Sequence, residues 1–179
     1  MYNKKELRKL FSKYRLYSAI VVILYILGAT PGFLQFFGIK PCLIVPFCIA
    51  LALCEEDFLT MGIYALGGLL VDVSAGRISG FFTIPLLVLC IACMLGVKFV
   101  FTADSKSAFA FSFAAMFILR NIDFIFNYLL FGYGGLTGFY VRQVIIHSRY
   151  SALFGIPFYF LVNKIMDYRP LKIDARWKA

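Results

Sequence analysis

Charged residues are scarce in this chain of 179 residues, at 15% of the total. An average soluble domain carries roughly 25%. Hydrophobic residues make up 62%, and the mean hydropathy is +0.86. A soluble domain of this size has too little interior to hide so much apolar surface. The composition therefore excludes a soluble globular domain, a disordered chain and a nucleic-acid-binding domain, and it predicts an integral membrane protein.

Signatures of catalysis, metal binding and disulfide formation are also lacking. The chain has one His, His147, and no nucleophile-elbow, zinc-protease or phosphate-loop motif. Its five cysteines lie in apolar runs, where they are expected to pack as small hydrophobic residues. They are Cys42, Cys48, Cys54, Cys90 and Cys93. We therefore expect no enzyme activity, no cofactor and no metal.

What the chain does contain is a series of apolar runs long enough to suggest membrane spans. We expect six, at residues 16–39, 41–54, 58–71, 78–97, 107–131 and 150–166. A helix needs about 20 residues to cross a bilayer, so the second and third runs are short. They form either two short spans or a re-entrant hairpin sheltered by protein. Proline interrupts several of the runs, and Pro31-Gly32 is expected to bend or break the far end of the first. Residues 141–146 are expected to form an interfacial helix.

Positive charge indicates how these spans are oriented. Residues 1–15 form a basic amphipathic segment, and residues 168–179 form a basic tail. The basic residues of the first segment are Lys4, Lys5, Arg8, Lys9, Lys13 and Arg15. With six crossings, thirteen Lys and Arg residues fall on the side of the termini and four on the other. The positive-inside rule then places both termini in the cytoplasm.

The predicted fold is therefore all-α, a compact bundle of about six transmembrane helices, some of them short or broken by proline. Residues 16–167 form one polytopic domain in contact with membrane lipid. No internal repeat or domain boundary divides it.

Two charged residues interrupt the fifth run. Arg120 and Asp123 are three positions apart, so they share a helix face and are expected to point inward and pair. Asn121 and Asn127 add polar groups nearby. The group is either an ion pair that fixes helix packing or a buried polar site for a ligand, a proton or a partner helix.

Small residues surround an acidic residue at the end of the third run. Ala65, Gly68 and Asp72 lie on one helical face, and Gly76 and Gly80 follow in the turn. Small residues allow another backbone to approach closely. This face is expected either to bind a partner helix or to pack within the protein, with Asp72 closing the turn or reaching a neighbouring helix end.

The same stretch resembles a known family. The order Gly68-Leu69-x-x-Asp72, a short turn and then Gly80 leading into the next span resembles the rod shape-determining protein MreD family between Gly62 and Leu87. Lys40-Pro41 opening the preceding apolar run also fits, as do the length and the basic tail.

The resemblance implies a non-enzymatic membrane scaffold of the bacterial cell-elongation complex, in the cytoplasmic membrane. Its implied partner is an MreC-like bitopic protein. MreB, a SEDS glycosyltransferase and a class B penicillin-binding protein would act in the same complex during lateral peptidoglycan synthesis. MreD-like proteins are similar in topology to the S components of energy-coupling-factor transporters, so a vitamin-type binding subunit is the alternative. The first span lacks the Ala-x-x-x-Ala pattern that such a subunit uses for docking, which favours the scaffold.

Overall fold

The computed structural model describes residues 4–30, 32, 34–35, 38–55, 57–76, 78–99, 104–129, 138 and 140–167. These residues form helices and no β-strand. The helices are α1 (Lys4–Ala29), α2 (Ile44–Cys54), α3 (Met61–Ala75), α4 (Thr83–Phe99), α5 (Ser105–Phe124), α7 (His147–Leu153) and α8 (Gly155–Asp167). A 3-10 turn, η1 (Phe58–Thr60), precedes α3; a π-helical turn, η2 (Ile125–Leu129), extends α5; and another, η3 (Val141–Ile146), leads into α7.

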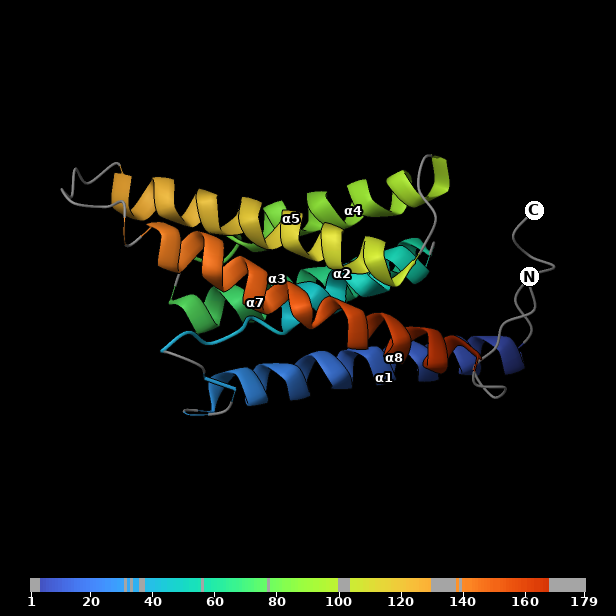
Figure 1. The fold of residues 1–179 in the computed structure, drawn as a ribbon. Helices are drawn as coiled ribbons and strands as arrows, with labels where there is room; N and C mark the ends of the chain where they lie inside the picture. Colours follow the sequence, from blue (N-terminus) through green and yellow to red (C-terminus); the bar gives the residue numbers. More distant parts are fainter. Residues whose placement is uncertain are drawn as a thin grey trace.

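The helices run back and forth between two ends of one bundle (Figure 1). The end at which α1 begins and α8 ends is termed the near end, and the opposite end is termed the far end. Helices α2 and α4 end toward the near end, whereas α1 and α3 end toward the far end. The expected all-helical bundle is confirmed at this level.

The short helix α2 forms the centre of the bundle. Every residue from Ile44 to Leu53 is buried, and α2 contacts α1, α3, α4, α5 and α8. A helix that is apolar on all sides is stable only when other elements surround it. This explains why α2 lacks any polar face. At 11 residues it is about 16 Å long, shorter than the helices around it.

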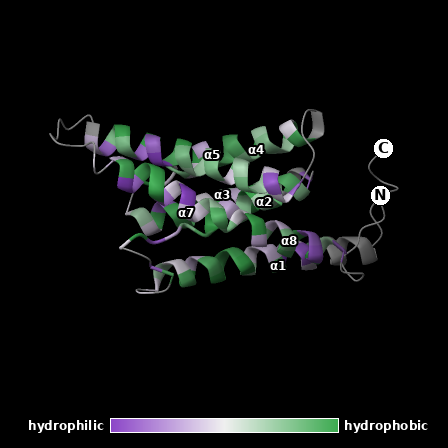
Figure 2. Cartoon of the chain, viewed as in Figure 1, coloured by the Kyte–Doolittle hydropathy of each residue, from purple (hydrophilic) through white to green (hydrophobic). Residues whose placement is uncertain are grey.

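Three helical segments are long and apolar enough to cross a membrane: Phe11–Ala29, Ser105–Tyr128 and Val141–Asp167. The helices at Ile44–Cys54, Met61–Ala75 and Thr83–Val97 are apolar but shorter. Large apolar side chains such as Ile23, Val88 and Phe160 are exposed on the outside of the bundle. Hydrophilic residues lie mostly toward the helix ends (Figure 2).

The first and last helices are placed differently from the apolar runs at the two ends of the chain. The first helix begins at Lys4, so the basic segment is continuous with the span. It ends at Ala29, just before Pro31-Gly32, where the sequence predicts a bend or break in the run at 16–39. Gly32 and Gly38 have positive φ angles of 81° and 75°, conformations that a continuing helix cannot contain.

The expected interfacial helix at residues 141–146 is instead the first part of a single helical segment, Val141–Asp167. Polar residues such as Gln143, Ser148 and Arg149 make this region resemble a loop in the sequence. They occupy the far-end turns of the helix, and Ser148 is fully buried there. The predicted basic tail at 168–179 lies outside the described residues.

Candidate functional site

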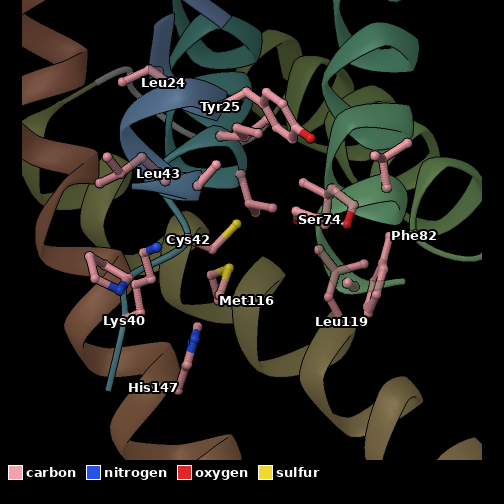
Figure 3. A pocket seen from close by; sticks show the side chains of 18 of the residues that line it. Leu24, Tyr25, Lys40, Cys42, Leu43, Ser74, Phe82, Met116, Leu119 and His147 are labelled. Carbon is pink, nitrogen blue, oxygen red and sulfur yellow. Dashed lines mark hydrogen bonds between the residues drawn. The ribbon is translucent and has the colours of Figure 1, made fainter. Parts of the chain in front are cut away.

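A cavity of about 600 Å³ lies at the far end of the bundle. It is bounded by the end of α1, the chain before and at the start of α2, the end of α3 and the middle of α5. In Figure 3, Lys40 and His147 lie at one end of it and Tyr25 at the other, with Cys42 and Met116 between. Its volume is in the range typical of sites for small organic ligands.

The cavity combines apolar walls with cationic groups. The residues that line it include the apolar side chains of Leu24, Val71, Phe82, Met116 and Leu119. Among the described residues that line it, Lys40 and Arg120 are charged, and none is Asp or Glu. Lys40 is half-buried, and its ammonium group has no hydrogen-bond or ion-pair partner in the part of the chain that the structure describes.

Arg120 and His147 contact each other at the edge of this cavity. Nη2 of Arg120 lies 2.8 Å from Nε2 of His147, whose side chain is buried. A guanidinium group can only donate, so Nε2 accepts, and the imidazole is the neutral tautomer with its proton on Nδ1. Nδ1 of the same ring lies 3.4 Å from Oγ of Ser151. His147 therefore holds the guanidinium group of Arg120 at the edge of the cavity.

Arg120 also pairs with Asp123, as the sequence predicted, with Nη1 and Oδ2 4.0 Å apart. Asn127 donates to Oδ1 of Asp123 at 2.9 Å. Asn121 accepts a hydrogen bond from the Tyr140 hydroxyl at 2.9 Å, on the next helical segment. A second cavity of about 200 Å³ is lined by Arg120 and Asp123. Arg120, Asp123 and Asn127 are thus brought together at the far end of α5, whereas Asn121 bonds to Tyr140 and to the backbone of its own helix.

Two hydrogen bonds attach the chain before α2 to the last helical segment. The Tyr150 hydroxyl donates to the carbonyl oxygen of Leu34 at 2.9 Å, and the backbone N–H of Cys42 donates to Oγ of Ser151 at 3.0 Å. Both bonds join residues more than a hundred positions apart. They hold the segment that carries Lys40 against the cavity.

Asp72 closes the turn between α3 and α4, which confirms one of the roles expected for it. Its side chain is buried and accepts three hydrogen bonds. The backbone N–H groups of Gly80 and Phe82 donate at 2.8 and 2.6 Å, and the Thr83 hydroxyl donates at 2.6 Å. One carboxylate therefore satisfies donors in the turn and at the start of α4.

The other small residues of this stretch have separate roles. A Cβ atom at Gly68 would lie 2.5 Å from Cα of Thr83, so Gly68 packs within the protein and is not free to contact a partner. Gly76 ends α3 in the left-handed conformation, with φ of 62°, and Gly80 has φ of 106° in the turn. Ala65 is half-buried on α3.

At the near end, a buried ion pair joins α1 to the end of α2. Lys13 pairs with Glu55, and both side chains are almost fully buried. The Tyr17 hydroxyl donates to Glu55 at 3.0 Å, and the Tyr14 hydroxyl lies 3.4 Å from Oδ2 of Asp57. Among the six basic residues predicted to mark the cytoplasmic side, Lys13 is thus a packing residue, whereas Arg15 is exposed. The backbones of Lys4, Lys5, Arg8 and Lys9 belong to α1.

The sequence did not predict that Lys40 and His147 line the same cavity. The sequence places His147 beside a loop, as an interfacial polar residue, because the region before residue 150 is rich in polar residues and glycine. The spacing of His147 and Ser151, four apart, is the signal that places both on one helix face. The five cysteines are free, and Cys48, Cys90 and Cys93 are buried, in agreement with the expected apolar packing.

Comparisons of the chain with protein-family models, with curated proteins and with solved structures found no match.

Proposed function

We propose that this protein is a non-enzymatic scaffold of the bacterial cell-elongation complex, in which it binds an MreC-like bitopic protein. The observation that carries the proposal is the Asp72 turn. Asp72 and Gly80, two residues on which the resemblance to the MreD family rests, are joined by a direct hydrogen bond. Gly68 packs against Thr83, which also bonds to Asp72. The residues of the motif are therefore joined in one turn between α3 and α4. Their shared structural role supports the resemblance on which the proposal rests.

The proposed location is the bacterial cytoplasmic membrane, with six crossings and the near end in the cytoplasm. Three long apolar helices and the exposed apolar side chains support membrane insertion. The start of α1 and the end of α8 at one end of the bundle are compatible with an even number of crossings (Figure 1). The excess of Lys and Arg on that side supports its cytoplasmic orientation.

A stripe on α3 is the proposed partner face. Gly62, Leu69 and Val73 are exposed, Ala65 is half-buried, and the four residues recur at intervals of three or four. They share one outward face of the helix. In lipid, helices associate through close packing rather than through a hydrophobic driving force, so the small residues Gly62 and Ala65 favour a helix partner.

Co-isolation of an MreC-like protein with the Gly62→Leu variant tests this role. A Cβ atom at Gly62 meets no other atom within 4 Å, so the substitution leaves the fold intact and adds bulk only to the outer surface. We expect wild type to retain the MreC-like protein and Gly62→Leu to lose most of it, at equal membrane abundance. Gly28→Leu, also unhindered within 4 Å, is the matched control and should retain the partner. Failure of wild type to retain the partner would contradict the scaffold role, whereas retention by Gly62→Leu would contradict only this face.

The cavity favours a second candidate, a small-molecule-binding S component of an energy-coupling-factor transporter. A cavity of about 600 Å³ at one end of the bundle is large enough for a vitamin-sized molecule. This candidate requires co-isolation with an energising transporter module instead of an MreC-like protein. The same affinity purification therefore discriminates between the two functions.

A further inference from the structure

We propose that the far-end cavity binds an anionic amphiphile. Its phosphate or carboxylate headgroup is held at the end of the cavity where Lys40 and His147 lie (Figure 3), next to Arg120, which contacts His147. Its apolar part lies along the remaining walls. This inference goes beyond the scaffold role and does not depend on it.

The charges of the cavity select the headgroup. Lys40 and Arg120 line the cavity, and Arg120 has an ion-pair partner in Asp123. Asp123 offsets one positive charge. The charge of Lys40 remains without a partner among the described residues. An anion placed beside this ammonium group would form a charge-assisted ion pair with it.

Hydrogen-bond donors are also left over at this end. Arg120 carries five N–H donors, and its side chain contacts His147 and Asp123. The neutral His147 holds the guanidinium in place and accepts from it, so it fixes the orientation of Arg120 without adding a positive charge. An oxyanion that accepts from Arg120 and Lys40 would form charge-assisted hydrogen bonds, which are among the strongest in proteins.

The remaining walls select an apolar tail. Apolar residues, among them Leu24, Val71 and Met116, make up most of the lining of the cavity. Since a water molecule occupies about 30 Å³ in the liquid, a small inorganic anion alone would leave most of the volume to water against apolar walls. A ligand with a hydrocarbon part fills this volume and removes apolar surface from water. Ala29, Val73, Ser74 and Ala75 are exposed lining residues at the ends of α1 and α3, and they provide the entrance.

The test uses the full chain, purified in a neutral detergent, and native mass spectrometry with three probes. Oleoyl-lysophosphatidic acid has an anionic head and a tail, oleoyl-lysophosphatidylcholine has the same tail with a zwitterionic head, and glycerol 3-phosphate has the head alone. We expect lysophosphatidic acid to bind at one site, about tenfold or more tightly than the zwitterionic lipid. Equal binding of the two lipids would overturn the anionic headgroup. Equal binding of glycerol 3-phosphate and lysophosphatidic acid would support the anion site and overturn the apolar tail.

Two substitutions with matched controls locate the binding. Gly28 lines the cavity, and a Cβ atom added there would meet no other atom within 4 Å, so Gly28→Leu adds bulk at the cavity wall without a clash and should weaken binding. Gly62→Leu, outside the cavity, should leave binding unchanged.

Lys40→Gln should weaken lysophosphatidic acid binding about tenfold. Lys106→Gln, which changes an exposed residue at the near end, should leave it unchanged. Unchanged affinity in Gly28→Leu, or in Lys40→Gln, would overturn the proposal. Because the probes bind or fail to bind without any partner protein, this result is independent of the scaffold test.

Discussion

At the scale of single residues, the buried carboxylate of Asp72 fixes the turn between α3 and α4. Asp72→Asn keeps the size of the side chain but replaces one acceptor oxygen with a donor group. At least one of the N–H groups of Gly80 and Phe82 then loses its acceptor. We expect a loss of about 1–3 kcal/mol in the free energy of unfolding. Thr83→Val removes only the hydroxyl donor and should cost less, about 1 kcal/mol. Thermal melting in detergent measures both, and an Asp72→Asn variant as stable as wild type would contradict this role.

Gly68 and Gly62 give a matched pair on one helix. A methyl group at Gly68 would meet the backbone of Thr83 at 2.5 Å, so α3 and α4 must separate to admit it. Gly68→Ala should lower stability by about 1–3 kcal/mol. Gly62→Ala meets nothing and gains helix propensity, so it should be neutral or stabilising by up to about 1 kcal/mol. Equal melting temperatures of the two variants would show that the close approach of Gly68 to Thr83 is not required.

The Arg120–Asp123 pair is tested by comparing single and double substitutions. Arg120→Leu leaves the carboxylate of Asp123, which is 13% exposed, without its cation. Removing one partner of a buried pair costs more than removing both. We therefore expect Arg120→Leu to melt at a lower temperature than Arg120→Leu with Asp123→Leu. A double variant that is much less stable than either single variant would instead indicate that the pair has a role beyond packing.

At the scale of elements, the position of α2 depends on contacts with α1. Glu55 is at the C-cap of α2, where a negative charge is unfavourable beside the helix dipole, and Lys13 from α1 compensates it. Lys13→Met should cost about 3–5 kcal/mol, since it leaves Glu55 buried and unpaired. Adding Glu55→Gln should recover much of that loss, which urea or dodecyl sulfate unfolding curves would measure. A double variant no better than Lys13→Met alone would contradict a direct coupling of the two charges.

The sequence predicted the elements in the middle of the chain better than those at its ends. The apolar runs at 41–54, 58–71, 78–97 and 107–131 correspond to α2, α3, α4 and α5 within a few residues. The first helix ends before the apolar run does, because the run continues past the helix into a segment that contains glycines with positive φ. The last helical segment begins at Val141, before the predicted start at residue 150, because it includes polar residues that are buried against protein, such as His147 and Ser148. Hydropathy describes how apolar a segment is and does not show whether the segment is helical or what surrounds it. It therefore cannot locate these two helix ends.

The same limit applies to the candidate site. The pairing of Arg120 with Asp123 is local, three residues apart, and the sequence predicted it. The contacts of Arg120 with His147 and of Lys13 with Glu55 join residues 27 and 42 positions apart, so they depend on how the helices pack. Periodicity contains no information about such contacts. The cavity likewise results from several elements that meet only in the folded bundle.

At the scale of the whole molecule, the proposed function depends on the bundle crossing a membrane with its near end in the cytoplasm. The far-end cavity would then open toward the outside of the cell, and the buried ion pair of α1 and α2 would lie near the cytoplasmic surface. The proposed MreC-like partner would span the same membrane, so the proposed contact with α3 requires this insertion. Orientation is therefore the central claim.

The most direct measurement is cysteine labelling with a membrane-impermeant maleimide in intact spheroplasts. The buried cysteines can stay, and the half-buried Cys42 and Cys54 are replaced by alanine. One new cysteine is placed at the far end by Ser79→Cys or at the near end by Asp104→Cys, both exposed positions. We expect Ser79→Cys to be labelled in intact spheroplasts and Asp104→Cys to be labelled only after permeabilisation. Labelling of Asp104→Cys but not Ser79→Cys before permeabilisation, or of both, would contradict the proposed orientation.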